Sequence, residues 1–144
     1  MRSASRKTIT LGIVATLSLF SASAFAVDHA VTVGVVVGGG FTFSPSTLTI
    51  AAGDTVTWNN PGGSAPHNTR SDAGSVTNFR CANGCDGAGG NGTPSAAAWT
   101  ATVTFPTPGT IPYYCEIHGG PGGVGMHGSI TVTTPVDLQS FEID

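Results

Sequence analysis

Hydrophobic and polar residues alternate along short stretches of the chain, and this alternation predicts β-strands. The clearest cases are Thr55–Asn59 and Trp99–Phe105, where every second side chain is apolar, as expected for strands with one buried face. No segment after residue 26 combines a helical period with capping residues. Further apolar or β-branched stretches predict strands at 31–37, 41–43, 47–50, 110–115 and 129–133. About seven to eight short strands separated by turn residues are typical of an all-β fold, a Greek-key β-sandwich or barrel.

The first 26 residues have the pattern of an export signal. Basic residues precede an apolar stretch of about a dozen residues, which is short for a membrane-spanning helix, and Ala24-Phe25-Ala26 provides a small-x-small cleavage site. The sequence therefore predicts a cleaved signal peptide at 1–26, with an uncleaved anchor as the alternative. We expect residues 27–144 to form a single domain that is periplasmic or secreted, without stable membrane insertion.

The charge that remains after residue 26 is strongly negative. Two arginines stand against eight acidic residues, which gives −6, compared with −3 for the whole chain. Such a surface argues against nucleic acid as a partner, since phosphates would be repelled. It favours, as the partner, a redox protein with a basic docking surface that electrostatic steering brings to this chain. This chain itself is expected to be a monomer.

The three cysteines fall into two classes. Cys81 and Cys85 lie close together in a long insert at 68–98, rich in Gly, Asn and Ser, that is expected to be irregular. In an exported protein this pair predicts a disulfide bond that staples the insert. Cys115 is left without a partner, and a metal bond would explain its presence.

Four residues have the donor atoms of a blue copper site. Cys115 ends a predicted strand, His118 follows three residues later, and Met126 comes after a glycine-rich turn, while His67 lies far upstream. Two imidazoles, one thiolate and a weakly bound thioether are the ligands of a type 1 copper ion. Zinc is the rival metal, either with these residues or with Cys81, Cys85, Cys115 and a histidine, but thioether is a poor ligand for zinc.

Three segments carry a resemblance to a known family. The stretch from Phe41 to Asn60, the Pro66-His67-Asn68 motif and the stretch from Tyr114 to His118 resemble the plastocyanin/azurin-like cupredoxins, the type 1 blue copper proteins. The resemblance implies a cupredoxin β-sandwich with one copper ion bound by His67, Cys115, His118 and Met126. It also implies that Asn68 hydrogen-bonds to the Cys115 loop. Seven residues separate His118 from Met126, which is more than is usual in plastocyanin-like proteins.

The sequence therefore predicts a protein that carries single electrons between redox partners, with no enzyme activity. The alternative is a periplasmic copper carrier or copper-resistance binding protein. No nucleophile or metalloprotease motif is present in the sequence. A second hypothesis concerns the start of the mature chain, where a free amine, two amide nitrogens and the imidazole of His29 would bind Cu(II) in a square-planar site.

Overall fold

A computed structural model describes residues 25–63 and 65–134 of the chain. The predicted signal peptide therefore lies almost entirely outside the described residues. Within them every regular element is a β-strand, in agreement with the all-β prediction. The same residues include no helix that is long and apolar enough to cross a membrane.

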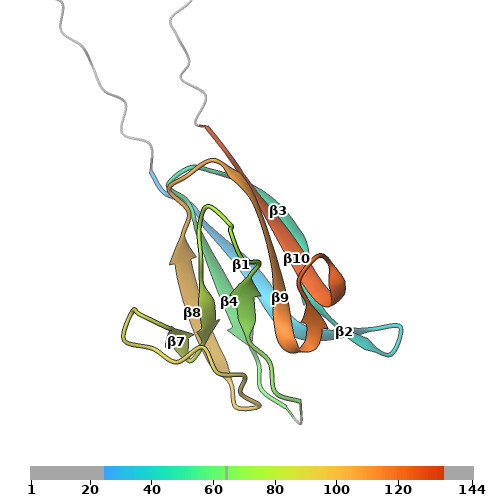
Figure 1. Cartoon of the computed structure of the whole chain (residues 1–144). Coiled ribbons are helices and arrows are strands. Elements are labelled where there is room, and N and C mark those ends of the chain that lie inside the picture. Colours follow the sequence, from blue (N-terminus) through green and yellow to red (C-terminus); the bar gives the residue numbers. More distant parts are fainter. Residues whose placement is uncertain (1–24, 64, 135–144) are drawn as a thin grey trace, which may run out of the picture.

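The strands form two sheets that face each other (Figure 1). The first sheet has the order β2-β1-β4-β8. Its strands are β1 (Asp28–Val37), β2 (Gly40–Ser44), β4 (Thr55–Asn60) and β8 (Trp99–Thr104). The second has the order β3-β10-β9-β5-β6-β7. Its strands are β3 (Thr47–Ala51), β5 (Thr69–Ser71), β6 (Arg80–Ala82), β7 (Gly84–Cys85), β9 (Gly109–Gly120) and β10 (Val124–Thr133).

The core lies between the two sheets and is rich in aromatic side chains. Along β4 the side chains of Val56 and Trp58 are fully buried, while those of Thr55 and Thr57 are not, as the period of two predicts. The ring of Trp58 meets Tyr113 of β9 at a centroid distance of 5.5 Å and Phe79 at 5.0 Å. Both sheets thus contribute to one apolar cluster, which fixes the strand ends that hold the site.

Two of the strand pairs are parallel, which the sequence did not predict. β1 pairs in parallel with β4, and β10 pairs in parallel with β3. Both ends of the described chain consequently leave the sandwich at the same end (Figure 1). The turn between β9 and β10 lies toward the opposite end, and this is where the predicted metal-binding residues gather.

The segment 68–98 is more regular than expected. It contains β5, β6 and β7, and these three short strands are added to the seven strand segments expected from the sequence, which gives ten strands in residues 25–63 and 65–134. A disulfide bond joins Cys81 to Cys85, which confirms the predicted pairing. Cys115 is the free cysteine and is completely buried.

Candidate metal centre

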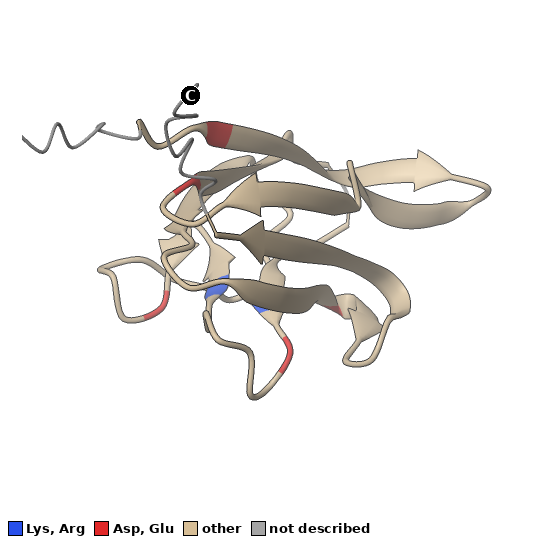
Figure 2. Cartoon of the chain, turned by 90° about the horizontal axis from the view of Figure 1, so that it is seen from above, with Lys and Arg blue, Asp and Glu red and all other residues tan. Residues whose placement is uncertain are grey.

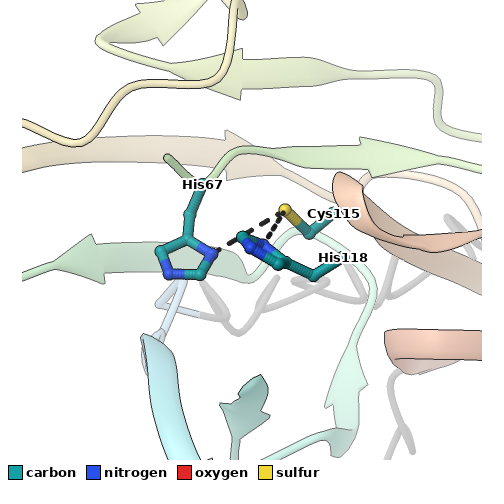
Figure 3. A group of neighbouring side chains, drawn as sticks. All are labelled: His67, Cys115 and His118. Carbon is teal, nitrogen blue, oxygen red and sulfur yellow. Dashed lines mark hydrogen bonds between the residues drawn. The ribbon is translucent and has the colours of Figure 1, made fainter. Parts of the chain in front are cut away.

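Three of the predicted ligands meet at one point between the strand ends (Figure 3). The Nδ1 atom of His67 lies 3.8 Å from the Sγ atom of Cys115, and the Nδ1 atom of His118 lies 3.6 Å from the same sulfur. The donor atoms of the three side chains all lie within 4.8 Å of one another. Three soft or borderline donors at this spacing leave room for one transition-metal ion between them.

The three side chains come from two separate segments that the sheet brings together. Cys115 and His118 both lie on β9, where Cys115 points into the core. His67 lies between β4 and β5, and its backbone forms a two-way hydrogen-bonded bridge with Ser95. The indole Nε1 of Trp99 also donates to the carbonyl oxygen of His67 at 3.2 Å. These bonds fix the backbone from which the imidazole projects.

The environment keeps the His67 imidazole neutral. This residue is only 4% exposed. Burial, together with the nearby charge of His118 when protonated, lowers the pKa of His67 below its ordinary value. A neutral imidazole can offer a lone pair to a metal, so burial prepares this residue for ligation.

Two residues of the β1–β2 hairpin close one side of the cluster. The ring of Phe41 packs against His67 at a centroid distance of 4.8 Å and against His118 at 4.7 Å. Gly34 sits at a β-bulge of β1 with a φ of +75°. A Cβ atom at Gly34 would lie only 2.7 Å from Nε2 of His67. A glycine is therefore required here by both backbone conformation and space.

Asn68 connects the two ligand-bearing segments, as the family resemblance implied. Its Oδ1 atom accepts a hydrogen bond of 2.9 Å from the backbone N–H of Glu116, the residue next to Cys115. Its Nδ2 atom donates to the carbonyl oxygen of Gly92 and to the Glu116 carboxylate. Asn68 is completely buried, so these bonds hold the His67 segment at a fixed distance from Cys115.

The Glu116 carboxylate forms ion pairs with both arginines of the described chain. Arg70 donates to one oxygen at 2.6 Å and Arg80 donates to the other at 2.7 Å. Burial would raise the pKa of Glu116, but the hydrogen bonds from Arg70, Arg80 and Asn68 outweigh it and hold the pKa below its ordinary value. Arg80 also pairs with Asp86 at 3.0 Å. Through this network the insert is attached to the strand that carries Cys115.

Sequence reasoning did not foresee this network or the hairpin contacts. Glu116 is separated from Arg70 by 46 positions and from Arg80 by 36. The available signal was compositional, since Arg70 and Arg80 are the only cations after residue 26. Two lone cations in an otherwise acidic chain are reasonable candidates for structural ion pairs.

Comparison with known proteins identifies the family. A family model described as copper binding proteins of the plastocyanin/azurin family matches residues 29–133. The chain belongs to the plastocyanin/azurin family. It is 38% identical over 94 residues to plastocyanin from Scenedesmus fuscus, which covers 65% of this chain and 89% of the relative. It is 37% identical over 101 residues to plastocyanin A/B from Petroselinum crispum, which covers 65% of this chain and 90% of the relative.

A solved cupredoxin structure has the same fold. A reduced tryptophan-to-tyrosine mutant of amicyanin superposes with a TM-score of 0.50 at 24% identity, covering 73% of this chain and 81% of the amicyanin chain. This likeness supports the cupredoxin sandwich. The family match and the imidazole–thiol–imidazole cluster identify the cofactor as a single type 1 copper ion.

Met126, the predicted axial ligand, lies at an irregularity of β10. The register between β9 and β10 shifts between Gly125 and His127, so that Met126 falls at a bulge. Its side chain is 2% exposed. A Cβ atom at Gly119 would lie 2.4 Å from the carbonyl oxygen of Met126, so this glycine lets the two strands approach closely. Met126 is thus a buried residue in the segment after His118, and its role as the axial ligand stays a prediction.

The structure argues against the hypothetical copper site at the start of the mature chain. Strand β1 begins at Asp28 and pairs with β4 from that residue onward. The Nε2 atom of His29 is already in contact with Asp54 at 3.0 Å. A square-planar site would need the amide nitrogens of residues 28 and 29 to turn toward one ion, which an extended strand does not allow.

Proposed function

We propose that this protein carries single electrons between redox proteins, with copper held by His67, Cys115, His118 and, as a weak axial ligand, Met126. Copper supplies the one-electron couple between Cu(II) and Cu(I). The observation that carries the proposal is the buried cluster in which both imidazole Nδ1 atoms face the Cys115 sulfur at 3.8 and 3.6 Å. Because the donor atoms of the three side chains converge on one point, we expect the binding of one ion to require little rearrangement.

The surroundings favour electron transfer over metal delivery. Cys115 is 0% exposed and His67 is 4% exposed, and the hydrogen bonds of Asn68 hold the two segments together. A site held rigid changes little when the oxidation state changes, which keeps the reorganisation energy low. A copper carrier or copper-resistance protein, the alternative function, must open its site to release the ion. This network would have to break first.

His118 is the proposed exit for the electron. It is only half-buried, whereas Cys115 and His67 are almost inaccessible. Near it in the chain are two exposed apolar residues, Pro121 in the β9–β10 turn and Val124 at the start of β10, and Val124 is 63% exposed. Together with Pro61 and Pro66 we propose that these residues form an apolar docking patch for the partner protein.

The charge distribution supports a general rather than a local electrostatic attraction. The acidic residues of the described chain are spread over several of its strands and loops, and the two arginines lie near each other (Figure 2). Two of those acidic residues, Glu116 and Asp86, are already paired with the arginines. The proposed basic partner would therefore be steered by the net negative charge, after export of this protein to the periplasm or the exterior.

The experiment is a visible absorption spectrum of the copper-loaded protein, followed by voltammetry. We expect an intense blue or green band from charge transfer between the Cys115 thiolate and Cu(II), and a reversible one-electron wave. The Cys115→Ser variant should lose the band, since a hydroxyl oxygen is not a soft donor, and His127→Ala, which changes an exposed histidine next to Met126, should keep it. An intense band in Cys115→Ser would refute the ligand assignment. Release of copper to a chelator without electron exchange would favour the carrier function.

A further inference from the structure

A buried carboxylate lies in the β3–β4 turn, far from the metal centre along the chain. Asp54 is 6% exposed. Its Oδ1 atom accepts a hydrogen bond of 2.9 Å from the backbone nitrogen of Val27. Its Oδ2 atom accepts one of 3.0 Å from the backbone N–H of Ala51 and lies 3.0 Å from Nε2 of His29. Both oxygens are therefore occupied.

This carboxylate has no permanent cation beside it in the described part of the chain. The imidazole of His29 is charged only when protonated. Arg70 and Arg80 are both engaged with Glu116. Buried charges in proteins are normally paired, because removing a carboxylate from water is costly without a compensating charge or a full set of hydrogen bonds. Asp54 has hydrogen bonds, but the opposite charge is missing.

Cleavage of the predicted leader would place a positive charge on the Val27 nitrogen, which is bonded to Asp54. The small-x-small motif Ala24-Phe25-Ala26 places the cleavage site between Ala26 and Val27. Hydrolysis by a signal peptidase adds water across this bond. The carboxylate remains on Ala26, and Val27 gains an amine that is protonated near neutral pH. The nitrogen that becomes charged is the nitrogen already bonded to Asp54.

We propose that Asp54 is the binding site for the mature amino terminus, so that removal of the leader converts a neutral hydrogen bond into a buried ion pair. Backbone contacts hold Val27 in place for this, since its carbonyl oxygen accepts a bond of 2.9 Å from Thr55. The hydrogen bond from Val27 has the largest effect on the pKa of Asp54, and together with the one from His29 it holds this pKa below its ordinary value. The carboxylate is thus ionised and available to the ammonium group. Maturation would then stabilise the folded domain directly, and this holds whether or not the protein transfers electrons.

The composition allows a clean test. The only lysine of the chain is Lys7, so the α-amine of Val27 is the only primary amine left after cleavage. The protein is produced with its leader and recovered after processing. Both the unsubstituted protein and the Asp54→Asn variant are then compared before and after acetylation of that amine, which gives four forms. Asp28→Asn is the matched control, because this neighbouring carboxylate bonds to Thr55 and Thr57 and not to the amino terminus. Urea unfolding gives the folding equilibrium constant of the four forms and of the control before and after acetylation.

We expect acetylation to lower the folding equilibrium constant about 5- to 30-fold, since a charge-assisted hydrogen bond is replaced by a neutral one. The same loss is expected in Asp28→Asn and no loss in Asp54→Asn. An equal loss with and without Asp54, or no loss at all, would overturn the proposal, as would a processed chain that begins at a residue other than Val27.

A second measurement does not depend on the folding of Asp54→Asn. The rate of acylation of the amine is followed against pH in native protein and in urea. The ion pair predicts a higher apparent pKa and slower reaction in the native form. Equal profiles in the two forms would overturn the proposal.

Discussion

The space beside His67 provides a specific test of how the site is held. In Gly34→Ala, the new Cβ atom would lie 2.7 Å from Nε2 and 2.9 Å from Cδ2 of His67. An ordinary contact begins near 3.4 Å, so the ring must move by at least 0.7 Å, the difference between 3.4 and 2.7 Å. The ring cannot swing away freely, because it is buried and packs against Phe41 and His118. The substitution should therefore displace a copper ligand.

The cost has two parts that a matched variant separates. An alanine at positive φ costs about 1–2 kcal/mol wherever it occurs. Overlap with a well-packed side chain adds about 1–3 kcal/mol. Gly38 is the control, because it lies in the same hairpin with a φ of +59° and nothing within 4 Å of its Cβ position. Gly38→Ala should show the first cost alone, and Gly34→Ala should show both.

The assay combines unfolding in denaturant with the visible and electron paramagnetic resonance spectra of the copper-loaded variants. Gly38→Ala should keep the spectra of the unsubstituted protein. Gly34→Ala should shift the charge-transfer band and weaken copper binding, since sites tolerate ligand displacements of only about 0.5 Å. Equal stability losses and unchanged spectra in both variants would refute the reasoning.

Three further predictions follow from the charged groups. Glu116→Ala should lower the free energy of unfolding by about 2 kcal/mol, because three hydrogen bonds are lost. The loss is not larger because the arginines are partly exposed to water. A denaturation curve equal to that of the unsubstituted protein would contradict this prediction. Folding lowers the pKa of Asp54, so its contribution to the free energy of unfolding is present above the unfolded pKa of about 4 and is lost as the pH falls through the folded pKa. The free energy of unfolding should therefore decline below about pH 4. A maximum of this free energy near pH 3 would contradict the prediction. The rate of electron transfer to a basic partner should fall as salt rises, since the Debye length is about 8 Å at 0.15 M, and stopped-flow rates that do not change with salt would leave the apolar patch as the docking force.

The elements that the sequence predicted are those governed by local rules. Strands β4 and β8 follow from alternation within six residues, and the Cys115–His118 pair follows from a spacing that one strand end can satisfy. The disulfide was predictable because its two cysteines are four positions apart. Each of these features depends on chemistry within a short segment, where periodicity and spacing are informative.

The features that were missed depend on contacts between distant segments. Nothing in the pattern of β1 distinguishes a parallel partner from an antiparallel one, and the pairing with β4 is decided by the whole sandwich. The short strands β5 to β7 have too few residues to show a period. The same applies to Phe41 beside the histidines and to Glu116 between two arginines, since only the folded sheets bring these residues together.

The two parallel strand pairs also determine how the protein responds to force. The first described strand, β1, runs alongside β4 in the same direction, and the last, β10, runs alongside β3 in the same direction. Because both described ends leave the sandwich at the same end, a pull that separates them acts across the strands and not along them. The hydrogen bonds of each ladder would then open one after another from that end, as in a zipper, instead of being loaded together. A polypeptide tethered by its two ends should therefore unfold at low force, starting where β1 and β10 leave the sandwich.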